Sequence, residues 1–140
     1  MRMEWRKYGY TMCGKTADTL SPRPLIETVL SNKTGKFPVL SMIDSGTDST
    51  VANADIAKAL HISPNTCQKV KLGGIGGNKE GSVCDITIFI PDFRLSMQVP
   101  VIFVEDPAFD VLLGQLHFFN EFKPQCLKLF NIEANLFQLA

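Results

Sequence analysis

The feature that most constrains the fold is an apolar run that leads into a short turn containing a carboxylate. The run covers residues 37–43, and the turn after it reads Asp44-Ser-Gly-Thr-Asp-Ser-Thr50. An apolar run of this length between turn-forming residues predicts a buried strand. Gly46 lets the backbone approach closely, and the hydroxyls beside it supply hydrogen bonds. We therefore expect the strand to present Asp44 for chemistry; the alternative is an acidic turn in a surface loop.

Length and charge narrow the choice of partner. The chain has 140 residues with 45% hydrophobic content, which fits one domain with a core. Fourteen basic and fourteen acidic residues balance, and neither sign forms a long run. We therefore expect a peptide or protein partner, not nucleic acid or a membrane surface. No apolar run approaches the roughly 18 residues of a membrane span, and residues 1–7 do not resemble a signal peptide, so we expect a cytoplasmic protein.

The four cysteines stand far apart in the sequence, at Cys13, Cys67, Cys84 and Cys126. They form no Cys-x-x-Cys motif, and no two histidines have the spacing of metal ligands. The sequence therefore predicts no metal and no cofactor. We expect reduced cysteines that pack as small apolar groups.

Most of the chain reads as strands separated by turns. Short helices are expected over residues 51–60, where apolar residues recur about every four positions, and over residues 115–122. The expected strands cover residues 25–30, 37–43, 68–72, 83–90, 95–104, 126–130 and 136–139. Residues 1–23 form a segment of uncertain structure, and residues 24–140 form the main domain. The fold class is mainly β with two short helices.

Three segments, in this order, resemble the retropepsin-like aspartic proteases. They are Asp44-Ser-Gly-Thr-Asp48, the glycine-rich Leu72-Gly-Gly-Ile-Gly-Gly77, and Asp110-Val-Leu-Leu-Gly114. The resemblance covers roughly residues 25–122. The order and spacing of the three segments make it specific, whereas any one segment alone would be a weak indication of the family. It implies a closed, mostly antiparallel β-barrel-like domain. It also implies that the third segment packs beneath the turn that contains Asp44.

The resemblance implies a peptidase that works as a homodimer. Two carboxylates held within a few ångströms cannot both ionise, so the pair holds one proton and acts as general base and general acid together. A chain with one such motif supplies one carboxylate. We therefore expect Asp44 from each of two chains to activate a water that attacks the peptide bond.

Other site residues follow from the same resemblance. The residues expected to support the active site are Ser45, Gly46 and Thr47. The residues expected to bind substrate are Asp48 and, in a flexible flap, Gly73, Gly74, Ile75 and Gly76. A turn-capping or salt-bridged role for Asp48 is equally compatible with the sequence. Retroviral proteases place an arginine after the glycine that matches Gly114, whereas this chain has Gln115.

Other readings of these motifs are weaker. A phosphate-binding loop at residues 73–77 needs a following helix, but a β-rich segment follows. Lys36 lacks the rest of a P-loop, so we assign it no role. His61 and His117 each stand alone in the sequence, and we expect these two histidines to serve packing or the surface. The alternative function is a catalytically silent or latent module of the same fold that binds peptides or dimerises. Asp44 and Gly46, together with the glycine-rich flap, favour the enzyme.

Overall fold

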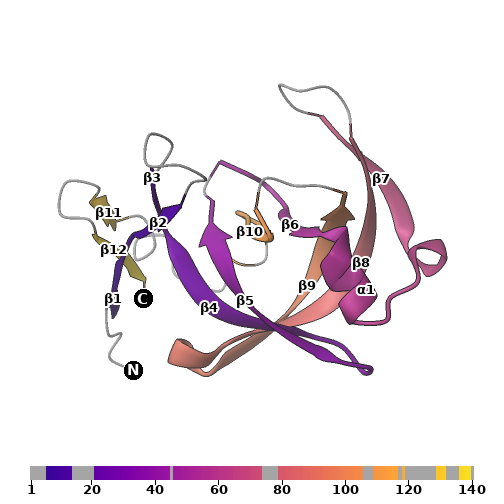
Figure 1. Cartoon of the computed structure of the whole chain (residues 1–140), viewed down its shortest axis with the longest axis horizontal. Coiled ribbons are helices and arrows are strands. Elements are labelled where there is room, and N and C mark those ends of the chain that lie inside the picture. Colours follow the sequence, from indigo (N-terminus) through magenta and orange to yellow (C-terminus); the bar gives the residue numbers. More distant parts are fainter. Residues whose placement is uncertain are drawn as a thin grey trace.

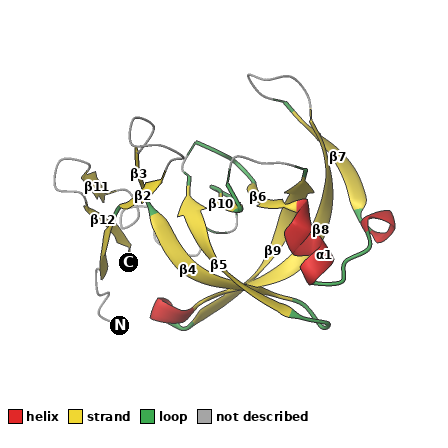
Figure 2. Cartoon of the chain, viewed as in Figure 1, coloured by secondary structure: helices red, strands yellow, loops and turns green. Residues whose placement is uncertain are grey.

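Six strands close into a barrel, as Figures 1 and 2 show. The structure is a computed structural model that describes residues 6–13, 21–44, 46–73, 79–105, 109–116, 118, 129–131 and 136–139. Around the barrel the strands are β4 (Leu25–Ser31), β5 (Lys36–Ile43), β10 (Val111–Leu113), β6 (Thr50–Asn53), β9 (Leu95–Val104) and β8 (Lys79–Ile90). The ring closes because β8 also pairs with β4. The predicted closed, mainly β fold is confirmed.

Two parallel pairings bring the ends of separate strands together. β10 runs parallel to β5 and antiparallel to β6, while β6 runs parallel to β9. The other pairings within the barrel are antiparallel. Leu113 lies opposite Ile43 in the register of β10 and β5. Asp44 and Gly114, which follow these two residues, are therefore placed at the same end of the barrel.

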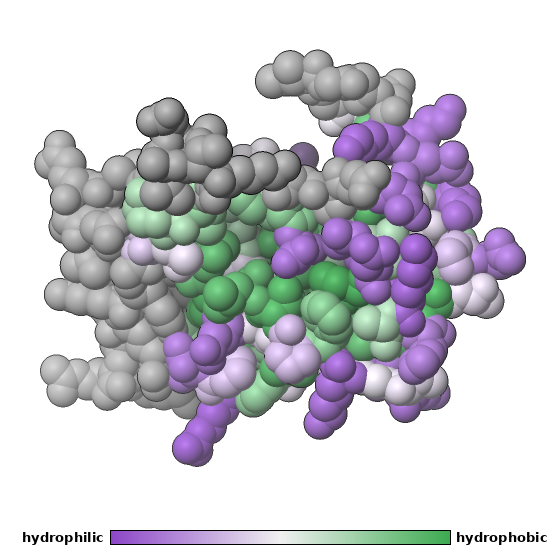
Figure 3. Space-filling model, in the orientation of Figure 1, coloured by the Kyte–Doolittle hydropathy of each residue, from purple (hydrophilic) through white to green (hydrophobic). Residues whose placement is uncertain are grey.

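Alternating burial along the strands builds the core. On β4, Ile26 and Leu30 point inward and are buried, whereas Glu27 between them is exposed. β8 repeats this pattern with Ile86, Ile88 and Ile90, which are all buried. Fully burying one such aliphatic side chain contributes about 1.5–3 kcal/mol. In Figure 3, hydrophobic residues are visible in the middle of the face shown.

The core also contains a buried pair of hydroxyls. The hydroxyl of Thr28 donates to the carbonyl of Val39 at 2.9 Å and lies 2.6 Å from the hydroxyl of Ser41. Because Thr28 already donates its proton to Val39, Ser41 is the donor between the two hydroxyls. This arrangement satisfies polar groups that would otherwise be costly to bury.

Helix α1 (Ala54–Ala59) begins later than the sequence predicted. The predicted start at residue 51 is wrong because Val51 and Ala52 pair with both β9 and β10 as part of β6. The carbonyl of the Asn53 side chain accepts a hydrogen bond from the Asp55 amide at 3.0 Å and caps the helix. Ile56, Ala57 and Leu60 are buried, so the predicted apolar face is present.

The other predicted helix, over residues 115–122, lies mostly outside the described residues. Gln115, Leu116 and Phe118 are described, and they form turns. Within the described residues, short 3-10 turns occur at Pro64–Thr66 and Pro91–Phe93. None of the helices in the described part of the chain is long and apolar enough to cross a membrane.

Strands from the first and last described parts of the chain form a small sheet of their own. β11 (Leu129–Asn131) and β12 (Leu136–Leu139) pair antiparallel, which confirms the predicted terminal hairpin in its described part. β1 (Arg6–Gly9) pairs antiparallel with β12, which was not predicted. β2 (Thr11–Cys13) and β3 (Ser21–Arg23) form a further two-stranded sheet. Figure 1 shows these elements grouped on the side of the barrel away from α1.

Cys67 and Cys84 form a disulfide, with 5.6 Å between their Cα atoms. The prediction of reduced cysteines is wrong for this pair. β7 (Gln68–Leu72) pairs with β8 so that Gln68 lies opposite Val83, and this register brings the two cysteines together. Cys13 is a free thiol, as predicted, and Cys126 lies outside the described residues.

Candidate active site

Asp44 lies at the end of β5, where backbone hydrogen bonds fix it from two sides. The amide of Ile43 donates to the carbonyl of Pro24 at 2.9 Å, and the amide of Asp44 donates to the carbonyl of Leu113 at 3.0 Å. The Asp44 side chain is half-buried, and its Oδ1 accepts a hydrogen bond from the amide of Gly46 at 2.9 Å. The backbone and the carboxylate of Asp44 are therefore both held in place.

Three further hydrogen bonds tie the turn after Asp44 to the residues that follow β10. The amide of Gln115 donates to the carbonyl of Thr47 at 2.9 Å, and the amide of Leu116 donates to the carbonyl of Asp48 at 2.7 Å. The amide of Gly114 donates to the hydroxyl of Thr50 at 3.3 Å. Thr50 is only 1% exposed, so this last bond is shielded from water. The two segments hold each other in one arrangement.

Gly114 is required where these two segments cross. A Cβ atom at this position would lie 2.5 Å from the carbonyl oxygen of Ser49 and 2.6 Å from its carbon. Real Cβ atoms are essentially never this close to backbone atoms. The expected packing of the third motif beneath the acidic turn is therefore confirmed, and it explains why a glycine ends that motif.

The supporting residues of the turn occupy distinct places. Gly46 is exposed, and a Cβ there would meet Asp44 Oδ1 at 3.2 Å, which is tighter than usual. The hydroxyl of Thr47 donates to the carbonyl of Ser49 at 3.2 Å. The side chain of Asp48 is exposed at the surface. Ser45 lies outside the described residues.

The predicted flap is described in its two arms. β7 and the start of β8 form five antiparallel pairs, from Gln68 opposite Val83 to Leu72 opposite Lys79. β8 thus begins four residues earlier than predicted and includes Gly81, where a Cβ would lie 2.7 Å from Ile102 Cγ2 on β9. Gly73 follows β7 and is exposed. The other predicted flap residues, Gly74, Ile75 and Gly76, lie outside the described residues.

Some residues near the turn were not singled out by the sequence. The guanidinium of Arg23 lies 5.3 Å from the centre of the Phe109 ring, and Arg23 precedes the proline whose carbonyl binds Ile43. This cation–π contact joins residues far apart in the chain, so no local motif could reveal it. Thr50 was read as the last residue of the acidic turn and was given no role, because its bond to Gly114 joins residues far apart in the sequence. Among the described residues, no three potential metal-binding side chains cluster.

The barrel and the crossed turns define a retropepsin-like aspartic protease fold. The EIAV protease in complex with the inhibitor HBY-793 shares it with a TM-score of 0.54 at 22% identity, over 66% of this chain and 82% of that chain. A retropepsin-like aspartic protease from Rickettsia conorii shares it with a TM-score of 0.65 at 12% identity, over 99% of this chain and all of that chain. At these identities the likeness concerns the fold.

The family follows from the sequence match. A family model described as aspartyl protease matches residues 29–116, which is more than half of the chain. The chain belongs to this aspartyl protease family. We found no match among curated protein sequences.

Proposed function

We propose that the chain is an aspartic endopeptidase whose active unit is a homodimer. The observation that carries the proposal is the Asp44 turn. The Asp44 backbone amide donates to the carbonyl of Leu113, and the half-buried Asp44 carboxylate accepts a hydrogen bond from the amide of Gly46. The chain has a single Asp-Ser-Gly motif, and the chemistry requires two carboxylates in one site. A second copy of the chain would supply the other Asp44.

The proposed reaction uses a water held between the two Asp44 carboxylates. The ionised carboxylate takes a proton from the water as its oxygen attacks the peptide carbonyl carbon. The protonated carboxylic acid donates its hydrogen bond, and then its proton, to the carbonyl oxygen. In the collapse of the tetrahedral intermediate, the carboxyl group that took the water proton gives it to the leaving nitrogen as the C–N bond breaks. The other carboxylate takes back a proton from a hydroxyl of the intermediate, which restores the pair. The reaction needs neither a metal nor a covalent intermediate.

The remaining site residues have supporting roles in this proposal. Ser45 would form hydrogen bonds across the two-fold axis between the turns. The amide of Gly46 orients the carboxylate, and the hydrogen bond of Thr47 stabilises the turn. The residues assigned to substrate binding are Asp48, whose side chain is exposed, and the flap residues Gly73, Gly74, Ile75 and Gly76.

We also propose that residues 24–140 form the protease domain. The barrel strands from β4 onward lie within this range. Residues 1–23 precede the domain, and the pairing of β1 with β12 attaches residues 6–9 to its terminal strand.

Asp44→Asn tests the proposal directly. The amide cannot accept the proton from water, so we expect cleavage of a peptide library to fall by about 100- to 10,000-fold. Circular dichroism and thermal unfolding should show an intact fold, because asparagine keeps the size of the side chain. Asp85→Asn is the matched control, since Asp85 is exposed on β8, and it should cleave at the wild-type rate.

Two outcomes would contradict the endopeptidase. One is an Asp44→Asn variant that cleaves the library as fast as the wild type. The other is a wild-type protein that binds library peptides but cleaves none of them between about pH 3 and pH 8. That second outcome would identify the chain as a silent peptide-binding module of the same fold.

A further inference from the structure

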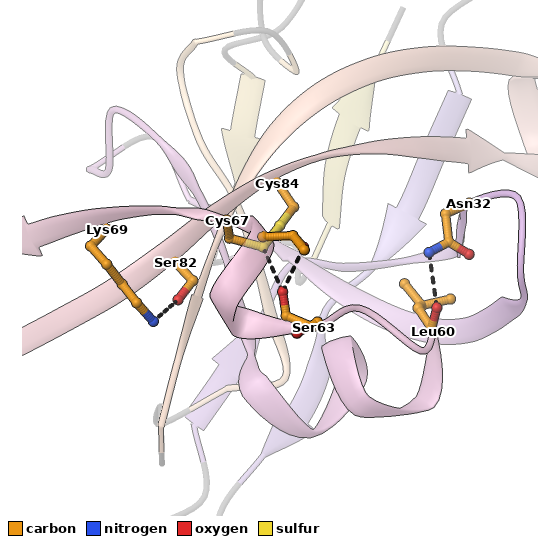
Figure 4. The surroundings of a disulfide bond; sticks show 8 residues. Asn32, Leu60, Ser63, Cys67, Lys69, Ser82 and Cys84 are labelled. Carbon is orange, nitrogen blue, oxygen red and sulfur yellow. Dashed lines mark hydrogen bonds between the residues drawn. A yellow bond between two sulfur atoms is a disulfide. The ribbon is translucent and has the colours of Figure 1, made fainter.

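The Cys67–Cys84 disulfide lies at the open end of the β7–β8 hairpin, as Figure 4 shows. Cys67 directly precedes β7, and Cys84 belongs to β8. The adjacent residues Gln68 and Val83 are the first pair of the hairpin. The disulfide therefore links the two arms one register position outside their first backbone pair.

β7 depends on few other attachments. In the described part of the chain it pairs only with β8, so its other edge has no neighbouring strand. Its residues are exposed or half-buried, and none belongs to the hydrophobic core. Figure 3 shows hydrophilic residues over this side of the molecule. Apart from backbone pairing, Lys69 Nζ donates to the hydroxyl of Ser82 at 2.9 Å. The disulfide is thus the covalent attachment of a weakly packed edge strand.

A cavity lies beside the disulfide, and Cys67 is one of its lining residues. It has a volume of about 350 Å³ and lies between α1, the Pro64–Thr66 turn and the hairpin. Ala57 and Phe103 contribute buried apolar lining, and Cys67 also lines the cavity. Cys67 Sγ lies 3.5 Å from the carbonyl oxygen of Ser63. The disulfide sulfur carries no proton, but a Cys67 thiol would find this carbonyl as a hydrogen-bond acceptor.

We propose that Cys67 and Cys84 form a thiol–disulfide switch that controls the attachment of β7. A dithiol reductant enters the cavity, and its thiolate attacks Cys67 Sγ. The S–S bond breaks, and Cys84 leaves as a thiolate. The second thiolate of the reductant then attacks the mixed disulfide and releases Cys67. Two electrons pass to the protein, two protons complete its thiols, and the reductant becomes a disulfide.

Reduction has a structural and a functional consequence. Without the cross-link, the start of β7 is held by backbone pairing to β8 and by the exposed contact of Lys69. The paired form of the hairpin then becomes less populated, because its unpaired states regain conformational freedom. The functional part rests on the proposed peptidase. If this hairpin binds substrate, reduction should weaken peptide binding and leave bond cleavage nearly unchanged.

Hydrogen exchange tests the switch without relying on activity. The oxidised full-length protein and the same protein reduced with dithiothreitol are compared, and maleimide mass tagging counts the free thiols. We expect the hydrogen-bonded amides of β7 to exchange at least about tenfold faster after reduction, with β9 unchanged. Cys67→Ser with Cys84→Ser should reproduce the fast exchange without reductant. Cys13→Ser is the matched control and should retain the full redox response.

Two results would overturn the switch. One is a disulfide that dithiothreitol does not reduce while the protein stays folded. The other is full reduction with unchanged exchange in β7, which would make the disulfide a passive cross-link.

For the peptidase, we expect reduction to raise KM about three- to tenfold with little change in kcat. The exchange result decides the switch whether or not the protein cleaves peptides.

Discussion

The Asp44 turn and strand β7 are attached to the barrel in opposite ways. The amides of Ile43 and Asp44 donate to the carbonyls of Pro24, between β3 and β4, and Leu113, in β10, and the turn is crossed by the residues that follow β10. β7 pairs on one side only, within the described part of the chain, and its first residue adjoins a disulfide. The acid is therefore held by contacts from several elements, whereas strand β7 is held from one side and by one cross-link.

The two regions also differ in the size of the individual contributions that stabilise them. Each hydrogen bond in the turn contributes a net stabilisation of only about 0.5–1.5 kcal/mol, but the bonds share one geometry and reinforce one another. The disulfide closes a loop between residues separated by 17 positions. A loop of this length gives a stabilisation of about 3 kcal/mol. The turn is therefore held by several small contributions, whereas the hairpin has one large contribution from the disulfide in addition to its backbone pairing.

The largest expected effect on stability comes from Gly114→Ala. The added Cβ would meet the backbone of Ser49, which cannot move without breaking the hydrogen bonds of the turn. We expect the free energy of unfolding to fall by about 3 kcal/mol or more, and peptidase activity to be lost. Urea unfolding monitored by circular dichroism measures the change.

Gly35→Ala is the matched control for that substitution. A Cβ at Gly35 would make only ordinary contacts, the nearest at 3.5 Å from the carbonyl oxygen of Ala59. We expect this variant to stay within about 1 kcal/mol of the wild type. Equal destabilisation by the two substitutions would show that the crossing of the turns is not as tightly constrained as described.

The next effect concerns the hairpin. Replacing both Cys67 and Cys84 with alanine should lower the free energy of unfolding by about 3 kcal/mol, because the unfolded chain loses its constraint. Turnover at saturating substrate should change little, since the Asp44 turn is untouched. A large loss of kcat in a folded double variant would contradict the claim that the disulfide of the hairpin does not affect turnover at the Asp44 turn.

A smaller effect is expected from Thr50→Val. Valine keeps the shape of threonine but leaves the buried amide of Gly114 without its acceptor. We expect a loss of about 1–3 kcal/mol in unfolding free energy. In the control Thr87→Val, the lost hydroxyl accepts a hydrogen bond from Gln98 at an exposed site, so the loss should be near 0.5 kcal/mol or less. Equal losses of unfolding free energy in Thr50→Val and Thr87→Val would show that the hydrogen bond from Gly114 to Thr50 has no special role in stability.

The sequence predicted features that depend on neighbouring residues. The strand leading to Asp44 and the terminal hairpin could be read from local patterns, and the closed β fold followed from the resemblance of three motifs to a known family. The start of α1 could not, because Val51 and Ala52 have helix-compatible neighbours but pair with β9 and β10. The disulfide escaped prediction for a similar reason. Cys67 and Cys84 meet only through the register of β7 and β8, which no spacing rule encodes.

The candidate site shows the same limit. The Asp44 motif and the glycine of the third motif were found because their residue types are unusual in that order. The bonds that hold them, such as that from Gly114 to Thr50, join residues 64 positions apart, so they require the folded chain. The contact of Arg23 with Phe109 is likewise a product of tertiary structure.

The most direct test of the central claim is a mixing experiment. Wild-type chains are mixed with a ninefold excess of Asp44→Asn chains, allowed to exchange subunits, and assayed for peptide cleavage. If each active site needs Asp44 from two chains, random pairing should reduce the activity per wild-type chain to about one tenth. An excess of Asp85→Asn chains should cause no such loss per wild-type chain. Undiminished activity in the Asp44→Asn mixture, with subunit exchange verified by mass spectrometry, would contradict the shared active site.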